Sequence, residues 1–336
     1  MRLPLKLSRK VRITRGYVPG QLAARADSVF VADDRTDILC IDANTSRTVW
    51  KVPAEGSDIA SLVGEVLLAT TWRSARGISA ESGRSLYVLN ATRLRLWQSR
   101  WMSINSDGLT LIDAVTGGVL ETRAPFPIAP SDLGLTRIDG EVMLYQAEEN
   151  TQVVAYDLWR QQLLWKRSLR REIADRFGCD VGVVVLRPLE CNVFLAHVTS
   201  RIVVGCSLAD GAILWDMAVP FDSPVVPHRD RIYVMLAQEG SESSPRLVCL
   251  DAGTGARVYD VVQSELHGMD LASYGTVHGD YIGFGTRGGL VGLFRLADGG
   301  LAWSYRYKRR LYAPVMTDQR LYVCADDGNL LIFEAV

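Results

Sequence analysis

One short pattern recurs along this chain of 336 residues and limits what the chain can fold into. In its clearest copy, Leu247–Tyr259, a strand-like run leads through Asp251 into a turn that contains Gly255, and an aromatic residue follows four positions later. Alternating apolar residues favour a strand, Asp can hydrogen-bond the turn backbone, and Gly can adopt a positive φ. The pattern therefore predicts a β-hairpin that ends in a large ring.

The same hairpin pattern occurs seven times. The copies span Ile41–Trp50, Ile78–Tyr87, Ile112–Glu121, Tyr156–Trp165, Cys206–Trp215, Leu250–Tyr259 and Phe294–Trp303. Successive copies end 34 to 50 residues apart. A period near forty residues with strand-like content is typical of a β-propeller, in which each repeat forms one four-stranded blade.

An eighth unit follows Ala313 and lacks one strand. Leu3–Leu7 and Val11–Ile13 both alternate apolar and polar residues, and we expect the first to complete the last blade, because this pairing removes an open sheet edge. The sequence thus predicts an all-β, eight-bladed β-propeller of four-stranded antiparallel blades. We expect a single domain over residues 1–336.

One segment departs from the strand pattern. Across Ser168–Phe177 every fourth residue is apolar, namely Leu169, Ile173 and Phe177, which predicts a short helical insertion near 168–177. Ser168 suits the N-cap position and Gly178 the position after the helix. The apolar face packs on the propeller rim or joins a partner interface. We expect the neighbouring arginines to point outward: Arg170, Arg171 and Arg176.

Composition narrows the class of protein. A net charge of −1 gives no overall attraction to nucleic acid or to an anionic membrane. No apolar run reaches about 18 residues, so no membrane span is predicted. The basic start lacks the apolar core of a signal peptide, and the six cysteines form no CxxC pair. These features predict a cytoplasmic protein with reduced thiols.

The motif D-A-x-T-G-x-x-x-W resembles the repeat of the pyrroloquinoline-quinone-type (PQQ-like) propellers. The best matches are Asp113–Gly117, Asp251–Gly255 and Ile41–Trp50. The plan is similar to that of the quinoprotein dehydrogenases and of the outer-membrane assembly lipoprotein B. The resemblance implies that the terminal aromatic residues wedge between adjacent blades, here Trp50, Tyr87, Trp165, Trp215, Tyr259 and Trp303. An indole suits this role because it buries about 150–250 Å² and its N–H can reach a carbonyl.

The chain departs from both relatives. The dehydrogenases use a vicinal cysteine pair beside the quinone, whereas this sequence has no Cys–Cys dipeptide and is much shorter. The resemblance therefore implies a non-catalytic member without a cofactor. The assembly lipoprotein carries a lipid-modified cysteine near its start, whereas the first cysteine here is Cys40.

No catalytic, cofactor or metal site is predicted from the titratable residues. The histidines match no metal-binding spacing: His197, His228, His267 and His278. The adjacent carboxylates lie in turns between strands, where acidic residues stabilise the turn: Asp33–Asp34, Glu148–Glu149 and Asp326–Asp327.

Three basic stretches are the remaining candidates, Lys6–Arg15, Lys166–Arg176 and Tyr305–Tyr312. Each is either a solvated surface or a docking surface for an acidic protein. Nucleic acid is the least favoured ligand, because the chain is not basic overall. The candidate partner-binding residues are Arg170, Arg171, Arg176, Arg306, Lys308, Arg309 and Arg310.

The sequence as a whole predicts a non-enzymatic interaction scaffold or adaptor that binds one or more proteins through its loop faces. Two alternatives stay open. One is an enzyme or small-ligand sensor with a site in the central funnel. The other is a periplasmic envelope-assembly factor whose signal peptide has been removed.

Overall fold

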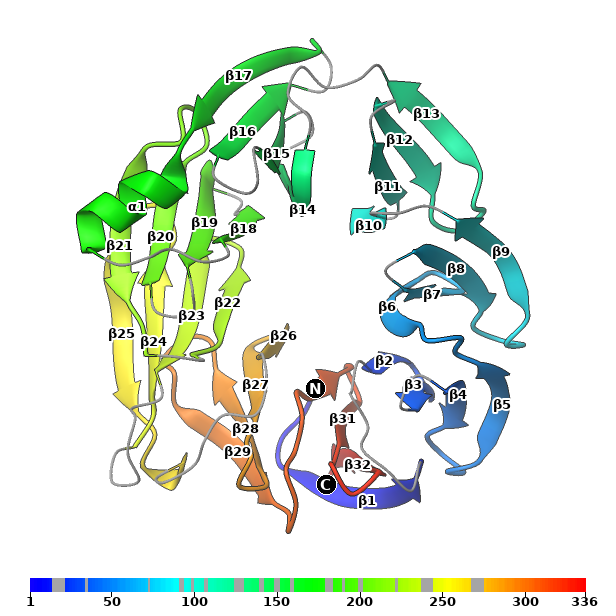
Figure 1. The fold of residues 1–336 in the computed structure, drawn as a ribbon. Coiled ribbons are helices and arrows are strands. Elements are labelled where there is room, and N and C mark those ends of the chain that lie inside the picture. The colour runs from blue at the N-terminus through cyan, green and yellow to red at the C-terminus, as the bar shows by residue number, and fades with distance from the viewer. Residues whose placement is uncertain are drawn as a thin grey trace. The chain divides into compact units, whose positions relative to one another are not determined.

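The computed structural model describes residues 1–13, 22–33, 36–71, 73–90, 94–97, 100–105, 108–123, 130–138, 142–147, 152–157, 160–178, 184–188, 191–198, 202–220, 223–236, 244–266 and 275–336. Within these residues the strands form eight four-stranded sheets, accompanied by one α-helix and one short 3-10 helix (Figure 1). All strand pairs described are antiparallel. The predicted all-β propeller fold with eight four-stranded blades is confirmed.

The chain forms two compact units. The first comprises Met1–Ser103, Thr110–Arg123 and Met269–Val336, and the second comprises Ile104–Leu109 and Ala124–Gly268. The expectation of one domain over the whole chain therefore stays a prediction.

The first unit holds five of the sheets. One sheet consists of β2 (Leu22–Arg25), β3 (Ser28–Asp33), β4 (Asp37–Asp42) and β5 (Thr48–Pro53), and the next of β6 (Asp58–Val63), β7 (Val66–Thr70), β8 (Ser74–Ser79) and β9 (Ser85–Asn90). A third consists of β10 (Leu94–Trp97), β11 (Arg100–Asn105), β12 (Gly108–Asp113) and β13 (Val119–Arg123). Residues 104–109 of this third sheet are grouped with the second unit. The other two are β26 (Thr276–His278), β27 (Tyr281–Gly285), β28 (Leu290–Arg295) and β29 (Leu301–Arg306); and β30 (Val315–Met316), β31 (Arg320–Cys324), β32 (Asn329–Ala335) and β1 (Leu5–Arg12).

The second unit holds three sheets and both helices. The sheets are β14 (Pro130–Ile138), β15 (Val142–Ala147), β16 (Gln152–Asp157) and β17 (Gln162–Arg167); β18 (Val184–Pro188), β19 (Val193–Val198), β20 (Ile202–Ser207) and β21 (Ile213–Ala218); and β22 (Val225–His228), β23 (Arg231–Leu236), β24 (Arg246–Asp251) and β25 (Arg257–Val262). The helices are α1 (Leu169–Phe177) and the 3-10 turn η1 (Ser264–Leu266).

The core lies between neighbouring sheets, because the middle strands are buried on both faces. In β3 the side chains of Val29 and Val31 pack with Tyr322 of β31, whereas Phe30, between them, packs with Leu67 of β7. Successive side chains of a strand point to opposite faces, so one short apolar run serves two interfaces.

The first strand completes the last sheet, as the sequence predicts. β1 pairs antiparallel with β32 from Leu5 opposite Ala335 to Arg12 opposite Asn329 (Figure 1). The strand begins at Leu5 rather than Leu3 and runs on through most of the second strand-like stretch.

A bulge lets β1 bury apolar side chains on both of its faces. The pairing with β32 shifts register between Leu7 and Arg9, which adds Ser8 as an extra residue and reverses the alternation of side chains. Leu5 and Leu7 therefore pack among residues of β28 and β29, whereas Val11 packs among residues of β3 and β32.

We expect removal of residues 1–10 to lower the urea midpoint of unfolding. The deletion exposes the edge of β32 and uncovers the two clusters that β1 joins. The measurement is a urea titration followed by tryptophan fluorescence. A synthetic peptide of residues 1–13, added in trans, should restore part of the lost stability. A deletion variant as stable as the full chain would contradict the structural role of β1.

Candidate functional site

The aromatic residues that end the repeats all lie on outer strands: Trp50 on β5, Tyr87 on β9, Trp165 on β17, Trp215 on β21, Tyr259 on β25 and Trp303 on β29. Three indole N–H groups donate to a turn carbonyl of the following sheet at 2.8–3.0 Å from nitrogen to oxygen: Trp50 to Ala80, Trp165 to Leu208 and Trp215 to Ala252. The hydroxyl of Tyr87 donates in the same way to Ala114. Each acceptor occupies the same place in its repeat, so one contact type joins successive sheets within each unit.

A bulge and a glycine of the following turn make room for four of the rings, those of Trp50, Tyr87, Trp165 and Trp215. The pairing of β20 with β21 shifts register between Gly205 and Cys206, so Leu214 is left over and is 52% exposed. In the following turn Gly255 has a φ of +69°, and a Cβ there would lie 2.5 Å from Cγ of Trp215. The motif glycine is therefore required both by its backbone conformation and by the ring beside it.

We expect Trp215→Ala and Trp303→Ala each to lower the free energy of unfolding by about 3–5 kcal/mol, as truncation of large packed side chains does. Each change also removes an indole N–H bond to a carbonyl. Leu214→Ala is the matched control: its side chain neighbours Trp215 but faces solvent, so its effect should stay within about 0.5 kcal/mol. Urea titrations measure all three, and an unchanged midpoint for either tryptophan variant would exclude the wedge role for that residue.

The last sheet is joined differently, because β32 and β1 come from opposite ends of the chain and no tight turn connects them. Here the indole of Trp303 donates to the carbonyl of Leu5 in β1 at 2.9 Å. Directly after the bulge, where other outer strands carry an aromatic residue, β1 carries Arg9, opposite Ile332. In addition to their apolar packing, this sheet and the sheet of β2–β5 therefore make a polar contact in place of the aromatic one.

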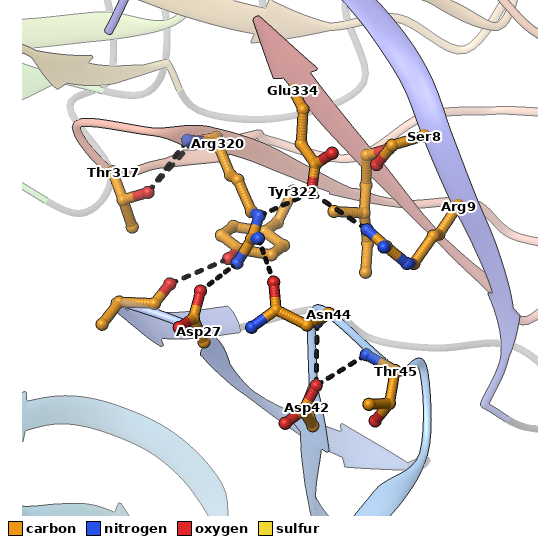
Figure 2. Close-up of polar contacts among 12 residues, drawn as sticks. Ser8, Arg9, Asp27, Asp42, Asn44, Thr45, Thr317, Arg320, Tyr322 and Glu334 are labelled. Carbon is orange, nitrogen blue, oxygen red and sulfur yellow. Dashed lines mark hydrogen bonds and ion pairs between the residues drawn. The ribbon is translucent and has the colours of Figure 1, made fainter.

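The polar contact centres on Arg320 of β31, which is 7% exposed (Figure 2). Its Nε donates to Glu334 at 2.9 Å, and Glu334 also accepts from Nη1 of Arg9 at 3.0 Å. Its Nη1 donates to Asp27 at 2.5 Å, and its Nη2 donates to the side chain of Asn44. Asp27 and Asn44 flank β3 and β4, so one guanidinium bridges the last sheet and the first.

The charges in this cluster hold one another ionised. Burial by itself would lower the pKa of Arg320, but hydrogen bonds with Asp27, Tyr322 and Glu334 raise it above its ordinary value. Burial would raise the pKa of Glu334, but Arg320 and Arg9 hold it below its ordinary 4.5. The group is thus a compensated ion network in which the guanidinium of Arg320 is buried and its ionic partners are partly exposed.

We expect Arg320→Ala to lower the free energy of unfolding by about 1–3 kcal/mol, because it removes a buried guanidinium and its charge-assisted hydrogen bonds to partly exposed carboxylates. The matched control is Arg231→Ala. Arg231 starts β23 as Arg320 starts β31 and pairs with Asp251 at 2.5 Å, but both side chains are about one-third exposed. That pair should contribute about 0–1 kcal/mol. Equal losses in the two variants would contradict the importance of the buried network.

The network also predicts a pH dependence. The lowered pKa of Glu334 stabilises the fold above 4.5, and this contribution is lost as pH falls below 4.5 and through the lowered pKa. We expect Glu334→Gln to be less stable than the parent at neutral pH, with a difference that narrows below pH 4.5. Urea midpoints at several pH values test this, and a difference independent of pH would contradict it.

The helix forms where it is predicted. Leu169 and Ile173 are fully buried among residues of β16, β19 and β20, so the apolar face packs on the protein's own sheets. Gly178 takes the left-handed conformation after the helix, with a φ of 63°. Ser168 occupies the N-cap position, but its side chain makes no capping hydrogen bond.

The helix arginines do not form a single outward-facing group. Arg171 is exposed beside Asp175, 3.8 Å away. Arg176 pairs with Asp216 of β21 at 2.5 Å, which fixes the end of α1 to its neighbouring strand. Arg170 is half-buried. The expectation that all three point outward is therefore correct for Arg171 and only partly so for the others.

The second candidate segment lies next to β1, although the two are about 300 residues apart in sequence. Nζ of Lys10 lies 5.1 Å from the ring centre of Tyr307, whose hydroxyl donates to Asp327 at 2.9 Å. The cations beside Tyr307 are exposed: Arg306, Lys308 and Arg309. Arg310 is half-buried, with its guanidinium 5.0 Å from the ring centre of Tyr312.

The exposed cations of β1 are Lys6, Lys10 and Arg12. Lys10 and Arg12 lie on the face of the strand that meets Tyr307, whereas Lys6, before the bulge, lies on the other face. Sequence reasoning marked the stretch as basic but did not place it beside 306–310. Only the pairing of β1 with β32 brings the two ends of the chain together. We define the basic edge as Lys6, Lys10, Arg12, Arg306, Lys308 and Arg309.

The titratable residues show no metal site in the part of the chain that the structure describes. No three His, Cys, Asp or Glu side chains there are placed to hold a metal ion. Nε2 of His278 lies 3.0 Å from Asp318, and the ring of His267 lies outside the described residues. Burial raises the pKa of Cys206 to about 12, which keeps this thiol protonated and unreactive. The helices described are too short or too polar to cross a membrane.

Comparison with known proteins gives a family and a set of similar folds. A family model described as outer membrane protein assembly factor BamB matches residues 105–280, just over half of the chain. Comparison with curated proteins gives no match.

Several solved structures resemble this chain over nearly all its length. BamB from Moraxella catarrhalis has a TM-score of 0.60 and 17% identity, over 98% of this chain and 100% of that chain. Quinohemoprotein alcohol dehydrogenase from Comamonas testosteroni has a TM-score of 0.63 and 11% identity, over 98% of this chain and 76% of that chain. The C-terminal WD40 domain of Sif2 has a TM-score of 0.66 and 11% identity, over 99% and 98%. At these identities the likeness establishes the propeller fold alone.

Proposed function

This chain belongs to the family described as outer membrane protein assembly factor BamB, and from that membership we propose that it is a non-enzymatic protein-interaction module of an assembly system. The family name refers to the assembly of other proteins, which requires contact with them. A rigid array of blades suits such a role because it fixes exposed loops and strand edges relative to one another.

One observation carries the proposal: the basic edge is exposed and poorly neutralised. Arg306, Lys308 and Arg309 make no ion pair with another described residue, and Lys6 of β1 makes none either. Scattered surface charges are ordinary, but a run of cations that two distant segments build together favours an acidic partner. Arginine can bind a carboxylate through two parallel hydrogen bonds.

The proposed location is the periplasm. The cytoplasmic location expected from composition finds no support in the family description, whose words refer to the outer membrane. The periplasmic alternative agrees with that description. Fractionation of native cells with an antibody against the protein tests the location, and recovery only with cytoplasmic markers would contradict it.

A catalytic role receives no specific support from the residues. The resemblance to quinoprotein dehydrogenases implied a vicinal cysteine pair beside the quinone, and the sequence has no such pair. The cysteines in the described parts of the chain are all free, and four of those five are buried. These residues do not fit a quinone site, so no reaction step is derived through one.

The proposal is tested by cross-linking in native cells followed by affinity capture and mass spectrometry. We expect specific protein partners in wild-type samples, and reduced recovery for Lys308→Glu with Arg309→Glu. Both side chains are exposed, so the melting temperature should stay close to that of wild type. Capture of the same proteins in equal amount by both forms would exclude the basic edge, and capture of none would contradict the interaction role.

The helix provides a second, independent test. We expect Arg170→Glu with Arg171→Glu to change stability by no more than about 1 kcal/mol, and to weaken partner binding if this face is used. Binding titrations and melting curves on the same double variant measure both effects. Unchanged affinity for every captured partner would remove the helix from the interaction surface and leave the basic edge.

A further inference from the structure

β1 is chemically unlike the other outer strands. Its eight residues, LKLSRKVR, include four cations and no carboxylate. Several charges on other outer strands are paired within the protein, namely Lys51 of β5 with Asp37, Asp216 of β21 with Arg176, and Asp260 of β25 with Arg246, whereas Arg306 of β29 makes no ion pair with another described residue. On β1 only Arg9 has an ion-pair partner among the described residues, namely Glu334.

The cations of β1 lie on a sheet edge, where charged side chains also discourage pairing between two copies of a protein. Here Lys10 and Arg12 lie on the same strand as Lys6, and Lys308 and Arg309 follow the ring that Lys10 contacts. Lys10 already interacts with Tyr307 and Asp327, and Arg12 donates to the main-chain carbonyl of Asp327. Lys308 and Arg309 have no ion-pair partner among the described residues, so they are the cations that an anionic ligand can neutralise.

The main chain of β1 is also available. β1 stands at the end of its sheet, in the order β1–β32–β31–β30, and it pairs with β32 and with no other strand described. One outward carbonyl, that of Leu5, accepts the indole N–H of Trp303. Beyond that point the strand edge runs on through Lys10 to Arg12, next to the exposed cations at 308 and 309.

We propose that the edge of β1 binds an acidic, extended segment of a partner protein, which adds to the sheet as a further strand. This inference rests on the proposed interaction role and names the kind of segment that is recognised. Main-chain hydrogen bonds to β1 supply part of the affinity, and carboxylates facing the basic edge supply the selectivity.

A peptide fits this surface better than other polyanions do. A lipid headgroup or a nucleic-acid backbone can neutralise the cations, but neither can form the ladder of N–H and C=O bonds that an open strand edge offers. The binding mode therefore distinguishes the ligands, because only a peptide depends on its own backbone N–H groups.

The test uses a capped, fluorescently labelled peptide of about ten residues with alternating Glu and Thr, the length of a long strand. We expect saturable binding by anisotropy, which weakens with added salt because exposed charges are screened. Two N-methylated peptides are compared, one methylated at its odd-numbered residues and the other at its even-numbered residues. Because a strand directs only alternate N–H groups toward its neighbour, one of these peptides should lose about tenfold or more in affinity and the other much less. Equal effects in both frames, or none, would overturn the strand-addition mode.

Two variants of the protein complete the test. Lys10→Glu with Arg12→Glu should lower the affinity for the acidic peptide about tenfold or more and should favour a Lys–Thr peptide instead. The matched control is Arg47→Glu with Arg84→Glu, which changes the net charge equally at exposed turn positions of two other sheets. Equal losses in both variants would show a general charge effect and overturn the proposal.

Binding to other anionic ligands is measured in the same way. Tighter binding to vesicles of phosphatidylglycerol and phosphatidylcholine, or to a single-stranded oligonucleotide, would overturn the peptide proposal in favour of that ligand. If partners are captured from cells but the acidic peptide does not bind, this inference fails while the interaction role stands. If the peptide binds as expected but no protein is captured, the interaction role fails and the edge is only a peptide-binding strand.

Discussion

The structure depends on a contact that the repeat makes again and again, in which an aromatic ring of one sheet reaches a turn carbonyl of the next. The indole of Trp215 both fills the space between two sheets and satisfies a carbonyl, that of Ala252. This contact needs a bulge, which turns the ring inward, and a glycine, which gives it room. The motif residues are thus physically linked, because losing any one of them disturbs the other two.

The last sheet does not make that contact with the first sheet. β1 carries Arg9 after its bulge, where other outer strands carry an aromatic ring. The protein instead uses the guanidinium of Arg320, which joins Glu334 on its own sheet to Asp27 and Asn44 beside the first sheet. A guanidinium has five donors in a fixed plane, so one side chain can serve several acceptors at once. A buried network of this kind gives specific geometry more than net stability.

The same joint creates the surface proposed for function. Completing the last sheet with β1 places a strongly basic strand at a sheet edge and beside Tyr307, so cations from both ends of the sequence gather there. Arg9 is neutralised by Glu334, and Lys10 contacts Tyr307, whereas Lys308 and Arg309 make no ion pair with another described residue. Closure of the sheet and exposure of a binding edge are therefore two results of one pairing.

The sequence by itself determined the repeat, the strands, the eight-bladed plan, the short helix and the pairing of the first strand with the last sheet. All but the last of these are local properties, since a turn with Asp and Gly and a four-residue helical spacing act over a few positions. The pairing of the two chain ends follows instead from the strand that the last repeat lacks. Only the tertiary structure decided which charged side chains are paired, which are buried and which stay exposed. It tied Arg176 to Asp216, buried Arg320 among acceptors from another sheet, and set the cations of β1 beside those at 306–309. Charges act through space and are cancelled or left open by neighbours distant in sequence, so periodicity carries no information about them.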